Sequence, residues 1–470
     1  MSTVHNAITL LILICCGLLY FIGLGWLLIG PLFHCKLFSK SIKISKMLEL
    51  SLVMISGIII NYGITLIFQS LKTALTIGGI LALLGLICYL VMLFGPIKRI
   101  LFSTDKLIKS TGIMLILGLL LGPIILLPLS RWDWDARYIW FFHAKMIYTA
   151  GALSQSTGWL HPSVVVSHVD YPNLVPALAA QLSCLMGFWN EYLPKLSLFF
   201  LLVPAVLILF TFFKSSSSFF FLLVLIPFSF SPKLWNGLMD GYLSLYFAIS
   251  MLLLGRYYKD FEINDLISCA ICLIPLLYLK NEGILALIAG IVAISLTLLL
   301  KKTKISIKMI FSKYWKPIII LLALSIPFLI WSYNKKQWGL TNDLELGTSQ
   351  SFVRFLNRIN DGSFKVILIA VSQQFNIGLI LLSILLFASM AVKNKIPNEI
   401  IPIILAVIIY CLGIIFVYMV TPLNLINQLN DSVDRTILTV NTGLYVACYY
   451  IFSSLRKGEE NKLINNVPNR

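Results

Sequence analysis

Apolar runs long enough to cross a lipid bilayer recur from one end of this 470-residue chain to the other. Hydrophobic residues make up 59% of the sequence and charged residues 12%, and the mean hydropathy is +0.93. A spanning helix needs about 20 mostly apolar residues, and in lipid only helices and closed barrels satisfy their own backbone groups. The pattern therefore predicts an all-α, polytopic helical membrane protein.

Hydropathy and turn residues divide the chain into about thirteen expected spans. They lie near 7–30, 47–69, 74–95, 111–129, 194–213, 218–232, 241–255, 265–279, 284–300, 317–333, 366–391, 398–420 and 436–454. The first run lacks a preceding basic region and is followed by further spans, so we expect an uncleaved membrane anchor. The expected organisation is N-terminal transmembrane helices at 1–109, a second membrane module at 110–454 and a cytoplasmic tail at 455–470.

A long polar stretch at 130–193 predicts a large outer loop with juxtamembrane helices. Residues 136–150 are rich in aromatic side chains and contain no helix breaker, which predicts a helix lying in the membrane interface and ended by Gly151. The apolar stretch 174–188 is short for a span, and we expect a half-inserted helix there. Pro172 biases Tyr171 towards an extended backbone and so separates these two helices.

Most of the 36 lysines and arginines fall on one of the two sides that this span count defines. By the positive-inside rule that side is cytoplasmic, and the 130–193 loop then faces the exterior. Since the basic residues border apolar runs, the net charge of +17 favours anionic lipid headgroups over nucleic acid as the partner. Frequent Lys, Ile and Asn favour a bacterial plasma membrane protein.

Nine cysteines are present, and nearly all fall inside apolar runs, which favours a packing role over disulfides or metal. Cys269 and Cys272 have the spacing of a redox or metal pair, but no second pair accompanies them within the expected span.

The segment Arg131–Arg137 (RWDWDAR) gathers two carboxylates and two guanidiniums beside a span. Ionisable residues within a membrane-spanning region usually mark a functional site. By the span count, four further polar corners reach the same outer side. They are Asp170–Pro172, Trp235–Gly241 with Asp240, Lys280–Gly283 with Glu282, and Asp431–Arg435. We expect these corners to line one cavity.

The order of these motifs resembles the GT-C class of membrane glycosyltransferases over about residues 110–440. An acidic turn after a span (Asp133, Asp135), an aromatic helix, an Asp170-Tyr-Pro element and the later Asp240, Lys280–Gly283 and Ser432–Arg435 corners follow the order that the class would have. Two features depart from it: three extra spans precede the acidic turn, and no soluble outer domain follows the last span.

The resemblance implies transfer of a hexose or pentose from a polyprenyl-phosphate carrier to an acceptor hydroxyl at the outer face, with inversion. Asp133 or Asp135 would be the base, and Asp133 is preferred because it follows the span most closely. Substrate contacts would come from Asp170, Tyr171, Asp240 and Glu282. The leaving phosphate would be bound by Lys280 and Arg435, and then by Arg137 and Lys145.

No cofactor is required by this scheme. A divalent cation held by Asp133, Asp135 and Asp240 is left open, because hard cations take carboxylate oxygens. The expected partners are the lipid-linked sugar donor, a glycan, lipid or protein acceptor, and membrane lipids.

Other interpretations of the same residues remain open. The Asp133–Arg137 charges suit an interfacial salt-bridge cluster, and Lys280 with Glu282 suits a structural pair. A transporter or lipid flippase would also place ionisable groups in a membrane, although we find no internal repeat. A surface-polysaccharide polymerase or ligase would use loop arginines such as Arg354 and Arg358. A purely structural scaffold fits these placed charges least.

Overall fold

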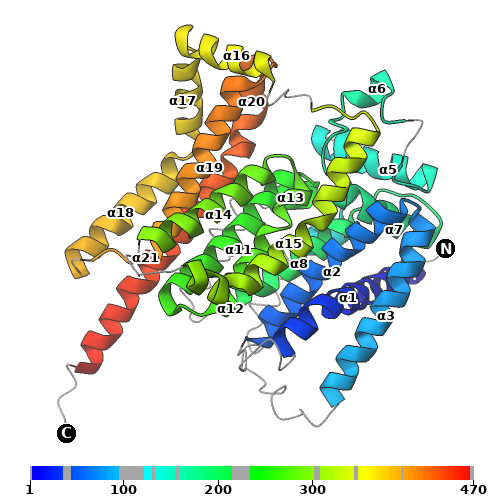
Figure 1. Ribbon diagram of the computed structural model, residues 1–470, viewed down its shortest axis with the longest axis horizontal. Helices are drawn as coiled ribbons and strands as arrows, with labels where there is room; N and C mark the ends of the chain where they lie inside the picture. The colour runs from blue at the N-terminus through cyan, green and yellow to red at the C-terminus, as the bar shows by residue number, and fades with distance from the viewer. Residues whose placement is uncertain are drawn as a thin grey trace. The chain divides into compact units, whose positions relative to one another are not determined.

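The computed structural model describes residues 3–34, 44–94, 118, 121–129, 133–154, 158–213, 233–300, 307–342, 348–393 and 395–465 (Figure 1). These residues form an all-α protein with 18 α-helices of defined bounds and one π-helix. Two compact units are present. The first comprises Met1–Thr211, Ser231–Tyr242 and Ile320–Thr341, and the second comprises Phe212–Phe230, Leu243–Ile319 and Asn342–Arg470.

The first unit contains α1 (Thr3–His34), α2 (Lys46–Phe68), α3 (Leu71–Phe94), the π-helix η2 (Ala136–Trp140), α5 (Phe141–Ala150), α6 (Pro162–Val165), α7 (Leu174–Met186) and α8 (Leu196–Phe210). The second contains α12 (Ile263–Leu273), α13 (Leu276–Leu279), α14 (Gly283–Leu300), α16 (Ser349–Asn360), α17 (Ser363–Gln374), α18 (Asn376–Lys393), α19 (Ile400–Val420), α20 (Leu425–Thr436) and α21 (Leu438–Asn465). Both units include part of α11 (Met239–Asp260) and of α15 (Ile307–Gln337).

Close backbone contacts build the core of the first unit, where α1 packs along both α2 and α3 (Figure 1). A Cβ atom on Gly25 would lie 1.7 Å from the Val53 carbonyl oxygen of α2, and one on Gly23 would lie 2.1 Å from the Ala82 carbonyl oxygen of α3. Small residues at these positions let the helices touch, as is common in membrane bundles. The other face of α2 packs on α8, so α2 is buried on nearly all sides.

The second unit is built around α11, α14, α19 and α21. The α14 helix packs on α19, and α21 packs on both α18 and α19. Ser244 Oγ of α11 lies 2.9 Å from Thr439 Oγ1 of α21. Near the other end of α11, Arg256 Nη2 pairs with Asp265 Oδ1 of α12 at 2.6 Å.

Several long apolar helices suggest membrane insertion. Five described helices are long and apolar enough to cross a bilayer: Ile8–Pro31, Lys46–Phe68, Leu71–Val91, Ile318–Gln337 and Ile400–Val420. A sixth span results if Ser363–Gln374 and Ile377–Val392, which are bent by 65° at their junction, count as one. These positions agree with six of the expected spans.

The expectation of thirteen spans is wrong. At about 1.5 Å per residue, the 15 residues of α8 cover roughly 22 Å, less than the roughly 30 Å of a bilayer core. The expected span at 265–279 is divided between α12 and α13, and α14 presents only a short apolar helix. The helices at 239–260 and 438–465 carry too many polar residues. The expected span at 218–232 and part of that at 111–129 lie outside the described residues.

The helices expected in the outer loop are present. A continuous helix does run from Ala136 to Ala150 and ends at Gly151, whose φ of 66° suits glycine. Trp140 and Phe141 of this helix are buried in the first unit. The helix α7 at Leu174–Met186 is too short to span by itself, is buried in the unit over most of its length and packs against α5.

Candidate functional site

Asp133 and Asp135 lie at the start of the helix that leads into α5. The backbone N–H of Arg137 donates to the Asp133 carbonyl oxygen at 3.1 Å, which begins the helix at this residue. Both aspartates are half-buried. Negative side chains at a helix start are stabilised by the unpaired N–H groups there. The sequence neighbours Arg131 and Trp132 lie outside the described residues.

The first turn after the two aspartates is a π-helix, η2, which is wider than an α-helical turn. Such turns are rare and occur often at functional sites. Buried Ala136, Ile139 and Trp140 fix this turn in the core, while Tyr138 remains 53% exposed. The acidic turn is thereby anchored on a buried helix and not on a free loop.

The Asp170–Pro172 element packs against this same helix. The Tyr171 ring stacks on Trp140 with 5.4 Å between ring centroids, and on its other neighbour His168 at 4.8 Å. Asp170 is buried, and its Oδ2 lies 4.0 Å from Lys335 Nζ near the end of α15. Lys335 was not singled out from the sequence, because its charge is one of several in a polar stretch.

The Asp240 corner also borders the helix. Gly237, with φ of 87°, is so close that an added Cβ would lie 2.8 Å from the Phe141 ring and 3.4 Å from the Ala136 Cβ. Asp240 itself is buried in the first turn of α11. Three sequence-predicted elements of the first unit, namely the acidic turn, Asp170–Pro172 and the Asp240 corner, therefore surround or belong to one helix.

Two basic residues expected to bind phosphate lie on this helix. Arg137 Nη2 lies 3.9 Å from Glu191 Oε1, and both side chains are more than one third exposed, so this pair contributes little to stability. Lys145 of α5 is exposed. Neither residue is tied into a buried network that would prevent it from meeting a ligand.

Lys195 is a buried residue that sequence reasoning missed. It is 2% exposed, and its Nζ donates to the carbonyl oxygens of Pro123 at 3.2 Å, Leu127 at 3.1 Å and Pro128 at 3.4 Å. Burial lowers the pKa of Lys195 to about 8. Lys195 thus binds the turn that precedes Asp133. Its position directly before the apolar run of α8 was the only sequence signal.

In the second unit, Lys280 and Glu282 form a buried pair between α13 and α14. Lys280 Nζ lies 3.2 Å from Glu282 Oε1, and the side chains are 7% and 16% exposed. Within the described part of the chain, Glu282 Oε2 is buried and has no hydrogen-bond partner. A buried carboxylate oxygen in this state is unusual and is suited to accepting a donor from a ligand.

Tyr418 of α19 contacts α20 and lies within the electrostatic influence of this pair. Its hydroxyl lies 2.9 Å from Ser432 Oγ and 3.0 Å from Thr436 Oγ1, and the charges of Lys280 and Glu282 act on it. Arg435, between those two α20 residues, donates from Nε and Nη2 to the Asp431 carbonyl oxygen at 3.2 and 3.0 Å. The expected corners at 280–283 and 432–435 are therefore near each other in this unit.

Arg354 and Arg358 project from α16 onto the end of α19. Arg354 Nε donates to the Val420 carbonyl oxygen at 2.7 Å, and Arg358 donates to the carbonyl oxygens of Tyr418 and Leu423. These arginines satisfy carbonyl groups at a helix C-terminus. Both arginines therefore hold α16 against the end of α19.

The described residues contain no group of three or more His, Cys, Asp or Glu side chains that would hold a metal ion. Asp133, Asp135 and Asp240 are thus not brought together as a metal site. Cys269 and Cys272 are buried free thiols in α12. Two histidines have hydroxyl partners: His143 Nε2 lies 2.8 Å from Ser167 Oγ, and His161 Nδ1 lies 2.6 Å from Ser163 Oγ.

The sequence matches no family model, and the comparisons with curated proteins and with solved structures found no match. The chain is a helical protein with several long apolar helices, and no family is identified.

Proposed function

We propose that this protein is a membrane glycosyltransferase of GT-C type, which transfers a sugar from a polyprenyl-phosphate carrier to an acceptor hydroxyl at the outer face of the membrane. The observation that carries the proposal is the anchored acidic turn. Two half-buried carboxylates begin a π-widened helix against which the Asp170–Pro172 element and the Asp240 corner both pack. Preorganisation of this kind serves catalysis more than it serves a surface salt bridge.

The proposed reaction is a single displacement with inversion. Asp133, or Asp135 in its place, takes the proton of the acceptor hydroxyl as the oxygen bonds to the anomeric carbon. The bond from that carbon to the carrier phosphate oxygen breaks on the opposite face, and the phosphate leaves with the electron pair. Asp170, Tyr171, Asp240 and Glu282 are the proposed substrate contacts.

Developing negative charge on the leaving phosphate needs fixed cations nearby. Lys280 and Arg435 are proposed for this role, with Arg137 and Lys145 as further candidates. The closeness of the 280–283 and 432–435 corners through Tyr418 supports the first two. The exposure of Lys145 and the weak pairing of Arg137 support the others.

The test is sugar transfer in membranes supplied with a labelled polyprenyl-phosphate sugar. Asp133→Asn and Asp135→Asn keep the shape of the turn and remove the basic oxygen, and loss of the general base lowers the rate by about 100-fold or more in one of them. Asp260→Asn, which changes an exposed carboxylate at the end of α11, is the matched control and retains wild-type transfer. Full activity in both turn variants, or solute flux without transfer, contradicts the proposal.

A further inference from the structure

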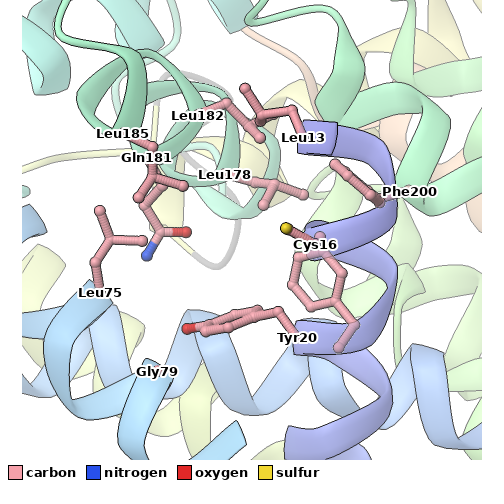
Figure 2. Close-up of a pocket in the computed structure, with 12 residues that line it drawn as sticks. Leu13, Cys16, Tyr20, Leu75, Gly79, Leu178, Gln181, Leu182, Leu185 and Phe200 are labelled. Carbon is pink, nitrogen blue, oxygen red and sulfur yellow. The ribbon is translucent and has the colours of Figure 1, made fainter. Parts of the chain in front are cut away.

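An apolar pocket of about 270 Å³ lies in the first unit among α1, α3, α7 and α8 (Figure 2). Its walls include Leu13 and Cys16 of α1, Leu75 and Gly79 of α3, and Leu182 and Leu185 of α7. None of the sequence-predicted site residues lines it. The pocket is therefore a feature that the proposed glycosyl transfer does not use.

Two lining residues, Tyr20 and Gln181, have polar ends, and both are bound to α2. The Tyr20 hydroxyl donates to Asn61 Oδ1 at 2.8 Å. Gln181 accepts from Asn61 Nδ2 at 2.7 Å and donates to Thr65 Oγ1 at 2.9 Å. Because these groups already have partners, the pocket offers a ligand hydrocarbon contacts and little hydrogen bonding.

The helices beside the pocket are apolar on their outer sides. Both α1 and α3 are candidate spans. Leu11 and Leu19 of α1 are 62% and 51% exposed, and Ile80 and Leu83 of α3 are 57% and 60% exposed. Cys16 and Leu185 in the lining are exposed too, so the pocket is open to its surroundings. In an inserted protein these surroundings are lipid chains.

An apolar cavity of about 150 Å³ is already large enough to stay dry and bind benzene. A pocket of about 270 Å³ is larger still and loses packing energy when empty. The pocket has little hydrogen bonding with which to select a particular headgroup. The group that occupies it is therefore the apolar group present at the highest concentration. Inside a bilayer the most abundant apolar group is the phospholipid acyl chain.

We propose that this pocket binds one acyl chain of a bilayer phospholipid. The chain packs between α1 and α3 and contacts Leu182 and Leu185 of α7, where it completes a helix bundle that is otherwise underpacked. The proposal is independent of the reaction, because Asp133 and Asp135 take no part in it.

Gly79 allows a direct test. An added Cβ at this position meets no atom within 4 Å, so Gly79→Phe fills the pocket without a backbone clash. The neighbouring Ile80 is 57% exposed, and Ile80→Phe is the matched control. By native mass spectrometry in mild detergent, wild type and Ile80→Phe retain a phospholipid that Gly79→Phe lacks. Adding phospholipid to delipidated protein raises the Tm of the first two and leaves that of Gly79→Phe unchanged.

Retention of the phospholipid by Gly79→Phe overturns the proposal, and so does an equal Tm response in all three proteins. A second measurement uses wild-type protein in nanodiscs made with phospholipid brominated on its acyl chains. Bromine density between Cys16 and Gly79 supports the proposal even if Gly79→Phe does not fold. An empty pocket in that experiment, or polyprenyl phosphate occupying it in the presence of excess phospholipid, contradicts it.

Discussion

His143 is a fully buried titratable residue, and its environment determines its protonation. Its Nε2 lies 2.8 Å from Ser167 Oγ, and the Ser167 hydroxyl donates to the Val164 carbonyl oxygen at 2.6 Å. The serine proton is thus already used, so His143 donates through Nε2–H. Burial, aided by the nearby His168, lowers the pKa of His143 to about 3.

This pKa predicts acid sensitivity. The folded pKa is below the unfolded value of about 6.5, so the folded state prefers neutral His143, and this stability is fully present above about pH 6.5. It is lost as the pH falls from about 6.5 towards 3, by at most about 1.4 kcal/mol per pH unit. Tm measured in detergent between pH 7 and 4 therefore falls less steeply for His143→Gln than for wild type.

His161→Gln is the control for this prediction, because His161 lies on the surface at the start of α6. It retains the wild-type dependence of Tm on pH. An unchanged slope in His143→Gln would show that the acid sensitivity arises at other groups.

The Lys280–Glu282 pair predicts a second residue-scale effect that separates structure from function. Lys280→Met leaves Glu282 buried without its cation, which lowers the free energy of unfolding by about 3 kcal/mol. Lys280→Met combined with Glu282→Gln removes both charges and restores most of that loss. Tm or urea unfolding of the two variants measures the difference.

The double variant also separates the two roles considered for this pair. A purely structural pair predicts that sugar transfer recovers together with stability. A phosphate-binding Lys280, or a substrate-binding Glu282, predicts that transfer stays low in a stable protein. Equal stability of wild type and Lys280→Met would contradict the buried pair itself.

At the scale of elements, α16 is fixed to the end of α19 by its arginines. A helix C-terminus leaves carbonyl groups without intrahelical partners and favours nearby cations. Arg358→Met removes the donors to the Tyr418 and Leu423 carbonyl oxygens and lowers the free energy of unfolding by about 2 kcal/mol. Lys365→Met, an exposed change on α17, has a much smaller effect on Tm. Equal Tm values for both variants would show that α16 is held by other contacts.

Hydropathy predicted which segments are helical better than it predicted which of them cross a membrane. The α8 and α19 sequences are similarly apolar, yet Phe200 and Leu209 of α8 are completely buried, whereas Leu412 and Phe416 of α19 are 59% and 52% exposed. A buried core helix and a lipid-facing helix have the same composition, and only tertiary packing distinguishes them. The short length of α8, 15 residues, became known only from the structure.

The candidate site shows the same division between local and tertiary information. The helix at 136–150 and its end at Gly151 follow from local residue preferences and were predicted. Lys195 contacts the 123–128 turn, and Asp170 contacts Lys335, so both contacts join residues far apart in sequence. The contact of Tyr418 with α20 joins residues closer in sequence but in different helices. Hydropathy and motif order carry no information on such pairs.

At the scale of the whole molecule, the lower span count affects the assignment of sides. The positive-inside argument assigned each loop by counting crossings, and several helices counted there are too short or too polar to cross. The outward orientation of the acidic turn is therefore a prediction that needs its own measurement. The proposed function requires one particular orientation, because the donor phosphate and the acceptor must meet on the same side of the membrane as the acidic turn.

Cysteine labelling in intact cells tests this orientation. Tyr138→Cys reports on the acidic turn and Asp431→Cys on α20, and both positions are exposed. A membrane-impermeant maleimide labels both from the exterior, relative to the unsubstituted chain, if the acidic turn and the α20 corner serve one outer active site. Labelling of Tyr138→Cys and Asp431→Cys from opposite sides would rule out a shared site and, with it, the assignment of Arg435 to the leaving phosphate.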